Sequence, residues 1–119
     1  MAYLLLIMER SEGRRRWSEA EGVSKREQML RWGDGLRARG VLRASESLRP
    51  DTEGIRIALD GAKRLVTEGP FAESKEIVGG FFLLDVDTKE QAVSVAHECP
   101  ASGWAMVEVR EIGPCWPPT

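Results

Sequence analysis

The stretch Glu68-Gly-Pro-Phe-Ala-Glu-Ser-Lys-Glu76, followed directly by the apolar run Ile77–Val86, decides how the fold is interpreted. A Gly-Pro pair interrupts regular secondary structure, and charged or hydroxyl side chains crowd the residues after it. The apolar run is typical of a buried strand, in which Gly79-Gly80 predicts a bulge or a close backbone approach. The sequence therefore predicts a rigid polar turn that leads into a central strand, on a scaffold built by the rest of the chain.

Upstream, the pattern predicts a strand, a polar loop and a helix. Tyr3–Met8 is continuously apolar, as in a strand covered on both faces, and Glu9–Gly22 has the composition of a mobile loop. Ser24 lies three residues before a glutamate and predicts a capping box at the start of the helix. Ser18 has the same spacing to a glutamate and offers an earlier start. Gly40 is expected to form the left-handed C-terminal cap.

Short strands follow the first helix. Val41–Leu48 is strand-like and ends before Pro50. Ile55–Leu59 alternates with period 2, which indicates a half-buried strand. Asp60-Gly61 is a tight-turn signal, so Lys63–Thr67 is expected to return antiparallel as part of a meander.

The C-terminal third predicts one more helix and one more strand. Asp87 and Glu90 fit a capping box that opens the helix, and Pro100 ends it. Trp104–Ile112 alternates and forms the last strand. The proline-rich tail 113–119 is expected to be extended or loose.

This order of elements predicts a single α+β domain over residues 1–119. An antiparallel ferredoxin-like sheet carries both helices on one face, which leaves the other face bare. A bare sheet face with apolar residues needs a partner, so we expect a homodimer that packs sheet to sheet.

Composition narrows the classes of partner. The chain has 119 residues, of which 42% are hydrophobic and 30% charged, so one core with a solvated surface is expected rather than disorder. The basic residues of the first half alternate with acids, as on a solvated helix face, so we expect no nucleic-acid binding. The apolar start is far shorter than the roughly 20 residues of a membrane span. We expect no membrane association.

The cysteine pattern favours a cytoplasmic protein with free thiols. Only Cys99 and Cys115 occur, without the short spacing of a redox or metal motif, and no secretory signal is apparent. A bridge between these two cysteines remains the alternative. No cofactor is expected, because the sequence holds no phosphate loop or dinucleotide fingerprint, and one histidine with two distant cysteines makes no metal site.

The sequence resembles the YCII-related proteins of the DGPF subgroup over nearly its whole length. The resemblance is carried by the central octapeptide and several shorter stretches, namely Gly69–Glu76, Gly79–Phe82, Leu84–Val86, Val107–Arg110, Tyr3–Ile7 and Gly40–Pro50. Glu68 stands where the subgroup's name has aspartate, and Ser74 where threonine is commoner. Both replacements keep the chemistry of the side chain.

The resemblance implies a dimeric α+β barrel of ferredoxin-like halves, in bacteria, with cleavage and isomerisation enzymes among the structural relatives. Wider members carry a proposed His–Asp pair with the histidine near the first helix. The sole histidine here, His97, belongs to the second predicted helix and is expected to be solvated, so that pair is not carried over. Members of the subgroup also look like companions of extracytoplasmic-function sigma factors. That likeness implies a regulatory accessory, bound to a sigma-factor-related protein, as the alternative function.

The turn supplies the candidate catalytic residues. Glu73 and Lys75 would share one side of an extended chain, with Glu76 on the other. A carboxylate beside an ammonium suits proton transfer, as in a lyase or isomerase, with Glu73 as base and Lys75 as electrostatic partner. Exposed ion pairs, or a carboxylate that merely holds the loop, are the structural alternatives. The sequence leaves open whether any reaction is catalysed.

Other residues near the turn are candidates for binding a small-molecule ligand. Phe71 is either a hydrophobic anchor or one wall of a cleft. Glu46 lies among small residues of a strand, where a carboxylate faces a cavity or solvent. Arg49 either binds an anion or meets a nearby acid. Glu68 and Glu76 complete the predicted cleft beside the turn.

Overall fold

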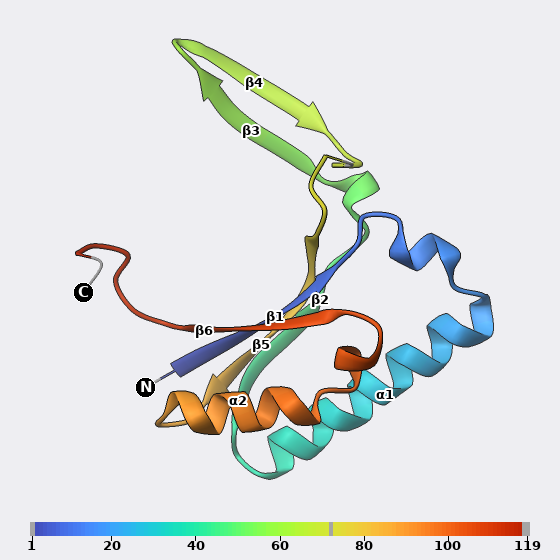
Figure 1. The fold of residues 1–119 in the computed structure, drawn as a ribbon, viewed down its shortest axis with the longest axis vertical. Helices are drawn as coiled ribbons and strands as arrows, with labels where there is room; N and C mark the ends of the chain where they lie inside the picture. Colours follow the sequence, from blue (N-terminus) through green and yellow to red (C-terminus); the bar gives the residue numbers. More distant parts are fainter. Residues whose placement is uncertain (1, 72, 118–119) are drawn as a thin grey trace.

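The computed structural model describes residues 2–71 and 73–117. Met1, Ala72 of the turn and the last two residues of the predicted tail lie outside this part. The main sheet has four strands, β1 (Ala2–Glu9), β2 (Leu42–Ser47), β5 (Ile77–Asp85) and β6 (Met106–Glu111). Their order is β2-β5-β1-β6 and all neighbours are antiparallel (Figure 1). The predicted ferredoxin-like α+β fold is confirmed, with β5 in a central position.

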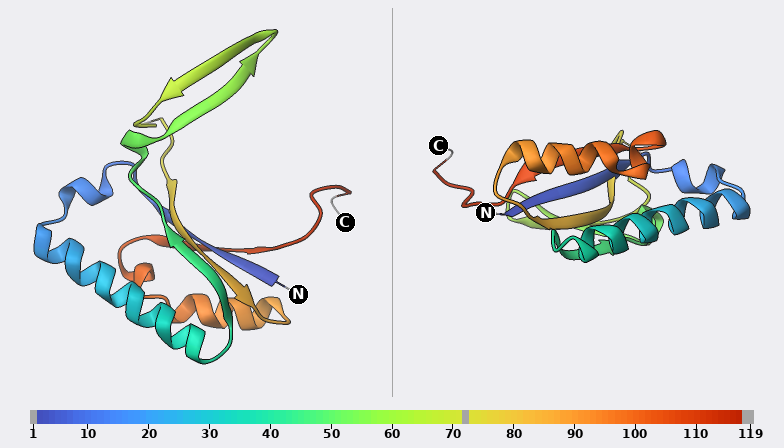
Figure 2. Two further views of the ribbon diagram at one scale, coloured as in Figure 1. Left: turned by 180° about the vertical axis from the view of Figure 1, so that it is seen from behind. Right: turned by 90° about the horizontal axis from the view of Figure 1, so that it is seen from below.

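Two helices, α1 (Glu19–Ala38) and α2 (Lys89–Glu98), cover one face of this sheet (Figure 2). Alternate residues of β1 and β5 point toward them, because side chains along a strand alternate between the two faces. The core lies in this layer, and its members are Tyr3, Leu5, Ile7, Leu36, Phe82, Leu84, Val86, Ala92, Val95, Cys99 and Ala101. Three short 3-10 helices connect the larger elements, at Gly13–Arg16 (η1), Asp51–Glu53 (η2) and Pro100–Gly103 (η3).

The first helix begins earlier than its favoured start at Ser24. Ser18 is the N-cap, its hydroxyl accepts a hydrogen bond from the Glu21 N–H at 3.1 Å, and the Glu21 carboxylate accepts from the Ser18 N–H. Ser24 lies inside the helix, where its hydroxyl accepts from Gln28. The polar loop expected over residues 9–22 is therefore shorter, and η1 fills part of it. The left-handed cap at Gly40 is confirmed by its φ of 73°.

The N-cap of the second helix lies one residue after the predicted one. Thr88 is the N-cap and forms the capping box with Gln91, whereas Asp87 and Glu90 were expected in these roles. The Gln91 side-chain oxygen accepts hydrogen bonds from the backbone N–H groups of both Thr88 and Asp87. One amide thus satisfies two donors that the helix leaves free.

Gly79 forms the bulge that the sequence predicts in the long strand. Ile7 lies opposite Gly80 and Met8 opposite Val78, so Gly79 has no partner residue on β1. A Cβ at position 79 would lie 2.6 Å from the carboxyl carbon of Glu9. The bare backbone at this point therefore lets a glutamate side chain lie directly against the strand.

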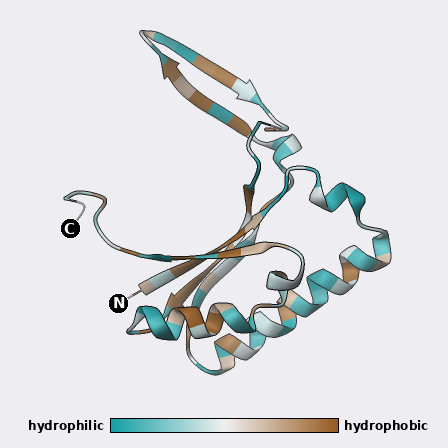
Figure 3. Cartoon of the chain, in the orientation of Figure 1, coloured by the Kyte–Doolittle hydropathy of each residue, from teal (hydrophilic) through white to brown (hydrophobic). Residues whose placement is uncertain are grey.

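Strands β3 (Ile55–Asp60) and β4 (Lys63–Glu68) form the expected hairpin, with Gly61 at a φ of 64° in the turn. They do not join the main sheet as a meander, and every one of their residues is exposed. The hairpin projects away from the body (Figure 1), and its hydropathy alternates along the strands (Figure 3). The expectation of a half-buried strand is wrong for the single chain. Alternation with period 2 shows that one face of a strand is apolar, but it does not show whether another part of the chain covers that face.

The polar turn after the hairpin is fastened to the body by Asp51. This carboxylate is only 7% exposed, and it accepts hydrogen bonds from the Phe71 N–H at 2.9 Å and from the Ser11 hydroxyl at 2.5 Å. Burial acts to raise the pKa of Asp51, but these two hydrogen bonds, a bond from its own backbone N–H and the charge of Arg15 together outweigh it, so the pKa lies below its usual range. A Cβ at Gly69 would lie 1.7 Å from the Asp51 carbonyl oxygen. These contacts fasten the start of the turn to the body, and the rigidity of the turn stays a prediction.

Two glycine substitutions test how the fold uses these residues. Gly69→Ala should lower the free energy of unfolding by about 2 kcal/mol or more, because the new methyl group collides with backbone that Asp51 holds in place. Gly35→Ala should raise it by about 0.5–1 kcal/mol, since position 35 is an exposed interior position of α1 with no neighbour within 4 Å. Urea unfolding followed by circular dichroism measures both. Equal effects of the two substitutions would contradict this account of the turn.

Candidate functional site

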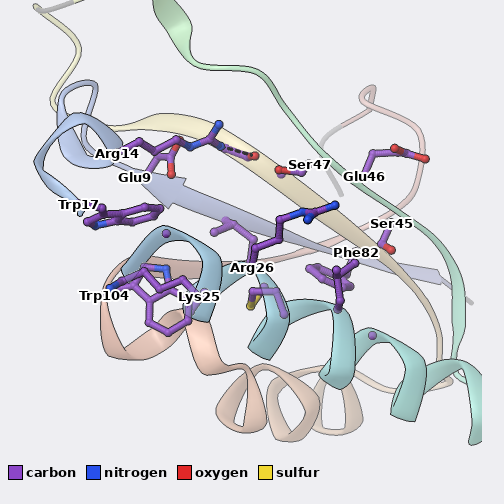
Figure 4. Close-up of a pocket in the computed structure, with 18 of the residues that line it drawn as sticks. Glu9, Arg14, Trp17, Lys25, Arg26, Ser45, Glu46, Ser47, Phe82 and Trp104 are labelled. Atoms are coloured by element: carbon purple, nitrogen blue, oxygen red, sulfur yellow. Dashed lines mark hydrogen bonds and ion pairs between the residues drawn. The ribbon is translucent and has the colours of Figure 1, made fainter. Parts of the chain in front are cut away.

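The larger cavity lies between α1 and the β2–β5 side of the sheet and has a volume of about 610 Å³ (Figure 4). Its apolar wall includes Met29 and Leu30 of α1, Phe82 of β5 and Trp104 after η3. Its polar wall comes from the end of β1, from η1, from α1 and from β2. A cavity of this size with an apolar wall and a few convergent polar groups has the features of a small-molecule site.

Glu9 and Arg14 form the most enclosed polar pair of this cavity. The Arg14 Nε lies 2.8 Å from Glu9 Oε1, and the side chains are 27% and 12% exposed, respectively. The same guanidinium donates to the carbonyl oxygens of Leu48 at 2.6 Å and Gly79 at 3.0 Å. Because three of its nitrogens are engaged, Arg14 fixes the carboxylate and leaves little capacity to bind anything else.

Burial raises the pKa of the Glu9 carboxyl above its usual range. The neighbouring Arg14 acts in the opposite direction, and the charge of Asp51 adds a smaller upward push. Within the described residues, Glu9 Oε2 has no ion-pair or hydrogen-bond partner and is not sealed from the cavity. A positioned carboxylate with a raised pKa and one unoccupied oxygen is suited to take up or release a proton.

Lys25 lies between two tryptophans at the opposite part of the cavity (Figure 4). Its Nζ is 5.0 Å from the ring centroid of Trp17 and 5.4 Å from that of Trp104. The ring faces attract the ammonium electrostatically but do not neutralise it. Trp17 thus contributes to the cavity wall.

A smaller cavity of about 440 Å³ lies beside the polar turn. Phe71 and Arg49 line it, so these two predicted residues are brought together there. Phe71 is buried, and the Arg56 guanidinium lies 3.8 Å from the centroid of its ring. Arg49 forms a two-point ion pair with the exposed Glu53, as a solvated structural pair would. Phe71 fits both of its predicted roles, as an anchor and as a cleft wall.

The other predicted site residues are scattered. Glu73 and Lys75, together with Glu68 and Glu76, are exposed, and none of the four lines either cavity in the described part of the chain. Glu46 lines the larger cavity, but its exposed carboxylate points away from the hollow in Figure 4. The turn therefore does not gather the predicted catalytic pair into a pocket of the single chain, and their role remains a prediction.

Sequence reasoning missed Glu9, Arg14 and Lys25. Glu9 is the first acid after the apolar first strand, which is a signal that the chain offered. Arg14 belongs to an arginine run that was assigned to a mobile loop, and its partners are 34 and 65 residues away in the sequence. Local periodicity cannot predict contacts between residues so far apart in the sequence.

The remaining chemically notable groups lie apart from the cavities. His97 is exposed on α2, as expected, and both cysteines are free, with Cys99 in the core and Cys115 exposed. Across residues 2–71 and 73–117, no three acidic, histidine or cysteine side chains converge as metal ligands. No helix in the described part combines the length and apolar character that crossing a bilayer requires.

Comparison with known families gives one match. The model of the YCII-related domain matches residues 1–115. No curated protein matches the chain significantly. The match covers all the strands and helices described above, including every residue of the larger cavity.

The titration of Glu9 tests the electrostatics of the cavity. Side-chain carboxyl ¹³C signals followed against pH should give Glu9 a midpoint above the usual glutamate value, because burial penalises its charged form. Arg14→Gln should move this midpoint further up, since the guanidinium acts to lower it. Glu21 serves as an internal reference with the opposite sign, because hydrogen bonds from Ser18 lower its pKa. A Glu9 midpoint at or below that of Glu21 would refute the assignment.

Proposed function

We propose that this chain, which belongs to the YCII-related domain family, binds a small organic molecule in the larger cavity and transfers a proton through Glu9. One observation carries the proposal: a carboxylate with a raised pKa is held by Arg14 at the wall of a cavity of about 610 Å³. Proton transfer within a lyase or isomerase is the reaction class that this arrangement suits best.

The proposed step is simple. The unoccupied oxygen of Glu9 accepts a proton from a carbon next to a carbonyl group of the ligand, and the resulting Glu9 carboxylic acid returns it at the same or a neighbouring atom. The raised pKa makes the carboxylate a stronger base than an exposed glutamate. Arg14 keeps Glu9 Oε1 in place, so that only Oε2 is free to react. No electron acceptor is required.

We further propose that the protein acts as a homodimer joined through the sheet face that the helices do not cover. Along β1 and β5 this face carries large apolar side chains that are only half-buried in the single chain: Leu4, Leu6, Met8, Phe81 and Leu83. The register sets Leu4 opposite Leu83 and Leu6 opposite Phe81, so the five form one continuous patch. A second copy presents the same patch, which fits a two-fold contact.

The hairpin gives a specific reason to keep a second candidate function, that of a regulatory accessory which binds another protein. Ile55, Ile57 and Leu59 of β3 share one face with Val66 of β4, and each is between 61% and 66% exposed. A two-stranded hairpin is marginally stable by itself, so an apolar face of this kind favours contact with another chain. A sigma-factor-related protein is the partner class that the family resemblance suggests.

Proton exchange on a small keto acid tests the proposed step. In D₂O, the wild-type protein should accelerate loss of the C3 protons of 2-oxobutanoate, measured by ¹H NMR. Glu9→Gln should reduce this acceleration by about 10²-fold or more, the usual contribution of a positioned general base. Glu12→Gln is the matched control, because Glu12 is exposed and pairs only with Arg16. Exchange that persists in the Glu9→Gln variant would rule out Glu9 as the proton acceptor.

Light scattering coupled to size exclusion tests the dimer. The wild-type protein should elute with twice the chain mass of 13.3 kDa. Phe81→Glu should shift it to the monomer, because the interface would otherwise bury an unpaired charge. Val93→Glu on α2 provides the control, since that side chain is 37% exposed on the helix-covered side. If the wild-type protein were a monomer at 100 µM, the proposal that the sheet face forms a dimer interface would be wrong.

A further inference from the structure

The charges of the larger cavity point to a class of ligand. Four basic residues line it, and they differ in what they already hold. Arg14 is engaged by Glu9 and by two backbone carbonyls, and Arg37 lies 3.7 Å from Asp34. Lys25 and Arg26 have no ion-pair partner within the described residues. Neither charge is held in an ion pair in that part of the chain, although Lys25 is near enough to Glu21 to lower the pKa of that carboxyl, and Glu46 also lines the cavity.

Both cations reach the cavity from the same helix. They are consecutive residues of α1, and both line the cavity. Lys25 is half-buried between two indole rings, and Arg26 extends across the hollow toward Ser45 and Ser47 (Figure 4). The indole faces restrict the ammonium without cancelling its charge. An anionic group that entered the cavity would thus meet a held ammonium and a guanidinium that is otherwise unpaired.

The opposite wall sets a limit on the ligand's charge. Glu9 is enclosed there, and its carboxylate would repel a second negative group. Arg14 offsets that repulsion through its charge, but its nitrogens already serve Glu9, Leu48 and Gly79 and have little capacity to bind a second carboxylate. Met29, Leu30 and Phe82 also line the cavity and offer apolar contact to the body of a ligand.

We propose that the cavity selects organic monocarboxylates, with the carboxylate bound by Lys25 and Arg26 and the apolar body directed toward Glu9. This inference rests on the proposed function, since it assigns a ligand class to the same site. It adds that the anion is bound by residues of α1, whereas the proton-transfer group lies at the end of β1. The carboxylate of the ligand is thereby kept away from the base that acts on its other end.

Three related probes test the charge preference: phenylacetate, its neutral isostere phenylacetamide and the dianion phenylmalonate, which carries a second carboxylate on the same carbon. Each is titrated into ¹⁵N-labelled protein, and the indole N–H signals of Trp17 and Trp104 are followed. Phenylacetate should shift both signals with a millimolar dissociation constant. Phenylacetamide should bind at least tenfold more weakly, a difference of about 1.4 kcal/mol, and phenylmalonate no more tightly than phenylacetate.

Substitution of the two cations locates the effect. The double variant Lys25→Gln/Arg26→Gln should weaken phenylacetate at least tenfold and leave phenylacetamide unchanged. Arg31→Gln is the matched control, because Arg31 is an exposed arginine of the same helix that does not line the cavity. Circular dichroism of the double variant verifies that α1 is intact.

The possible failures are distinguishable. Equal binding of phenylacetate and phenylacetamide, or no shift with either, overturns the monocarboxylate proposal, as does tighter binding of phenylmalonate. Equal binding of acid and amide still leaves a small-molecule site, and the exchange assay on Glu9 then decides the proposed function by itself. Conversely, a charge preference without Glu9-dependent exchange supports a binding site that performs no proton transfer.

Discussion

The guanidinium of Arg14 is the contact on which the architecture of the cavity depends. It joins three segments that are distant in the sequence: the end of β1 through Glu9, the residue after β2 through the Leu48 carbonyl, and the bulge of β5 through the Gly79 carbonyl. Only arginine presents enough donors in one plane to do this, whereas a lysine ammonium would act as a point charge. The bulge takes part because the Gly79 carbonyl turns away from β1 and accepts from both Arg14 and the Leu48 N–H.

The loop after β1 is therefore attached to the body at two points. Arg14 binds the β2–β5 region, and Ser11 donates to Asp51, which in turn holds the polar turn through the Phe71 N–H. One short segment thus couples the wall of the larger cavity to the turn that lies beside the smaller one. The turn is held by this attachment and by the close approach of Gly69 to the Asp51 backbone, so its own contributions to these contacts come from the uncharged residues Gly69 and Phe71.

Local patterns predicted the elements of this fold well and the site poorly. Apolar runs located the strands, and the Gly79-Gly80 pair correctly indicated the bulge, because both signals reside in neighbouring residues. The placement of the hairpin outside the main sheet depends on pairing between distant strands, which alternation does not encode. For the same reason the crowded charges of the turn drew attention to Glu73 and Lys75, whereas the enclosed carboxylate lies 64 residues earlier at Glu9.

Some of the basic residues in the first half of the sequence line the larger cavity. The excess of basic residues in the first half was attributed to a solvated helix face, and for Arg31 and Arg16 that reading is sufficient, since both are exposed. Lys25 and Arg26 differ, because they line a hollow in which the enclosed acid, Glu9, is already paired with Arg14. The Glu9 carboxylate is paired within the protein, whereas the charges of Lys25 and Arg26 are not, in the part of the chain that the structure describes. The electrostatic potential therefore differs between parts of the cavity. Such a potential orients an anionic ligand before any hydrogen bond forms. One part of the cavity then binds the anion, while another part remains available for chemistry.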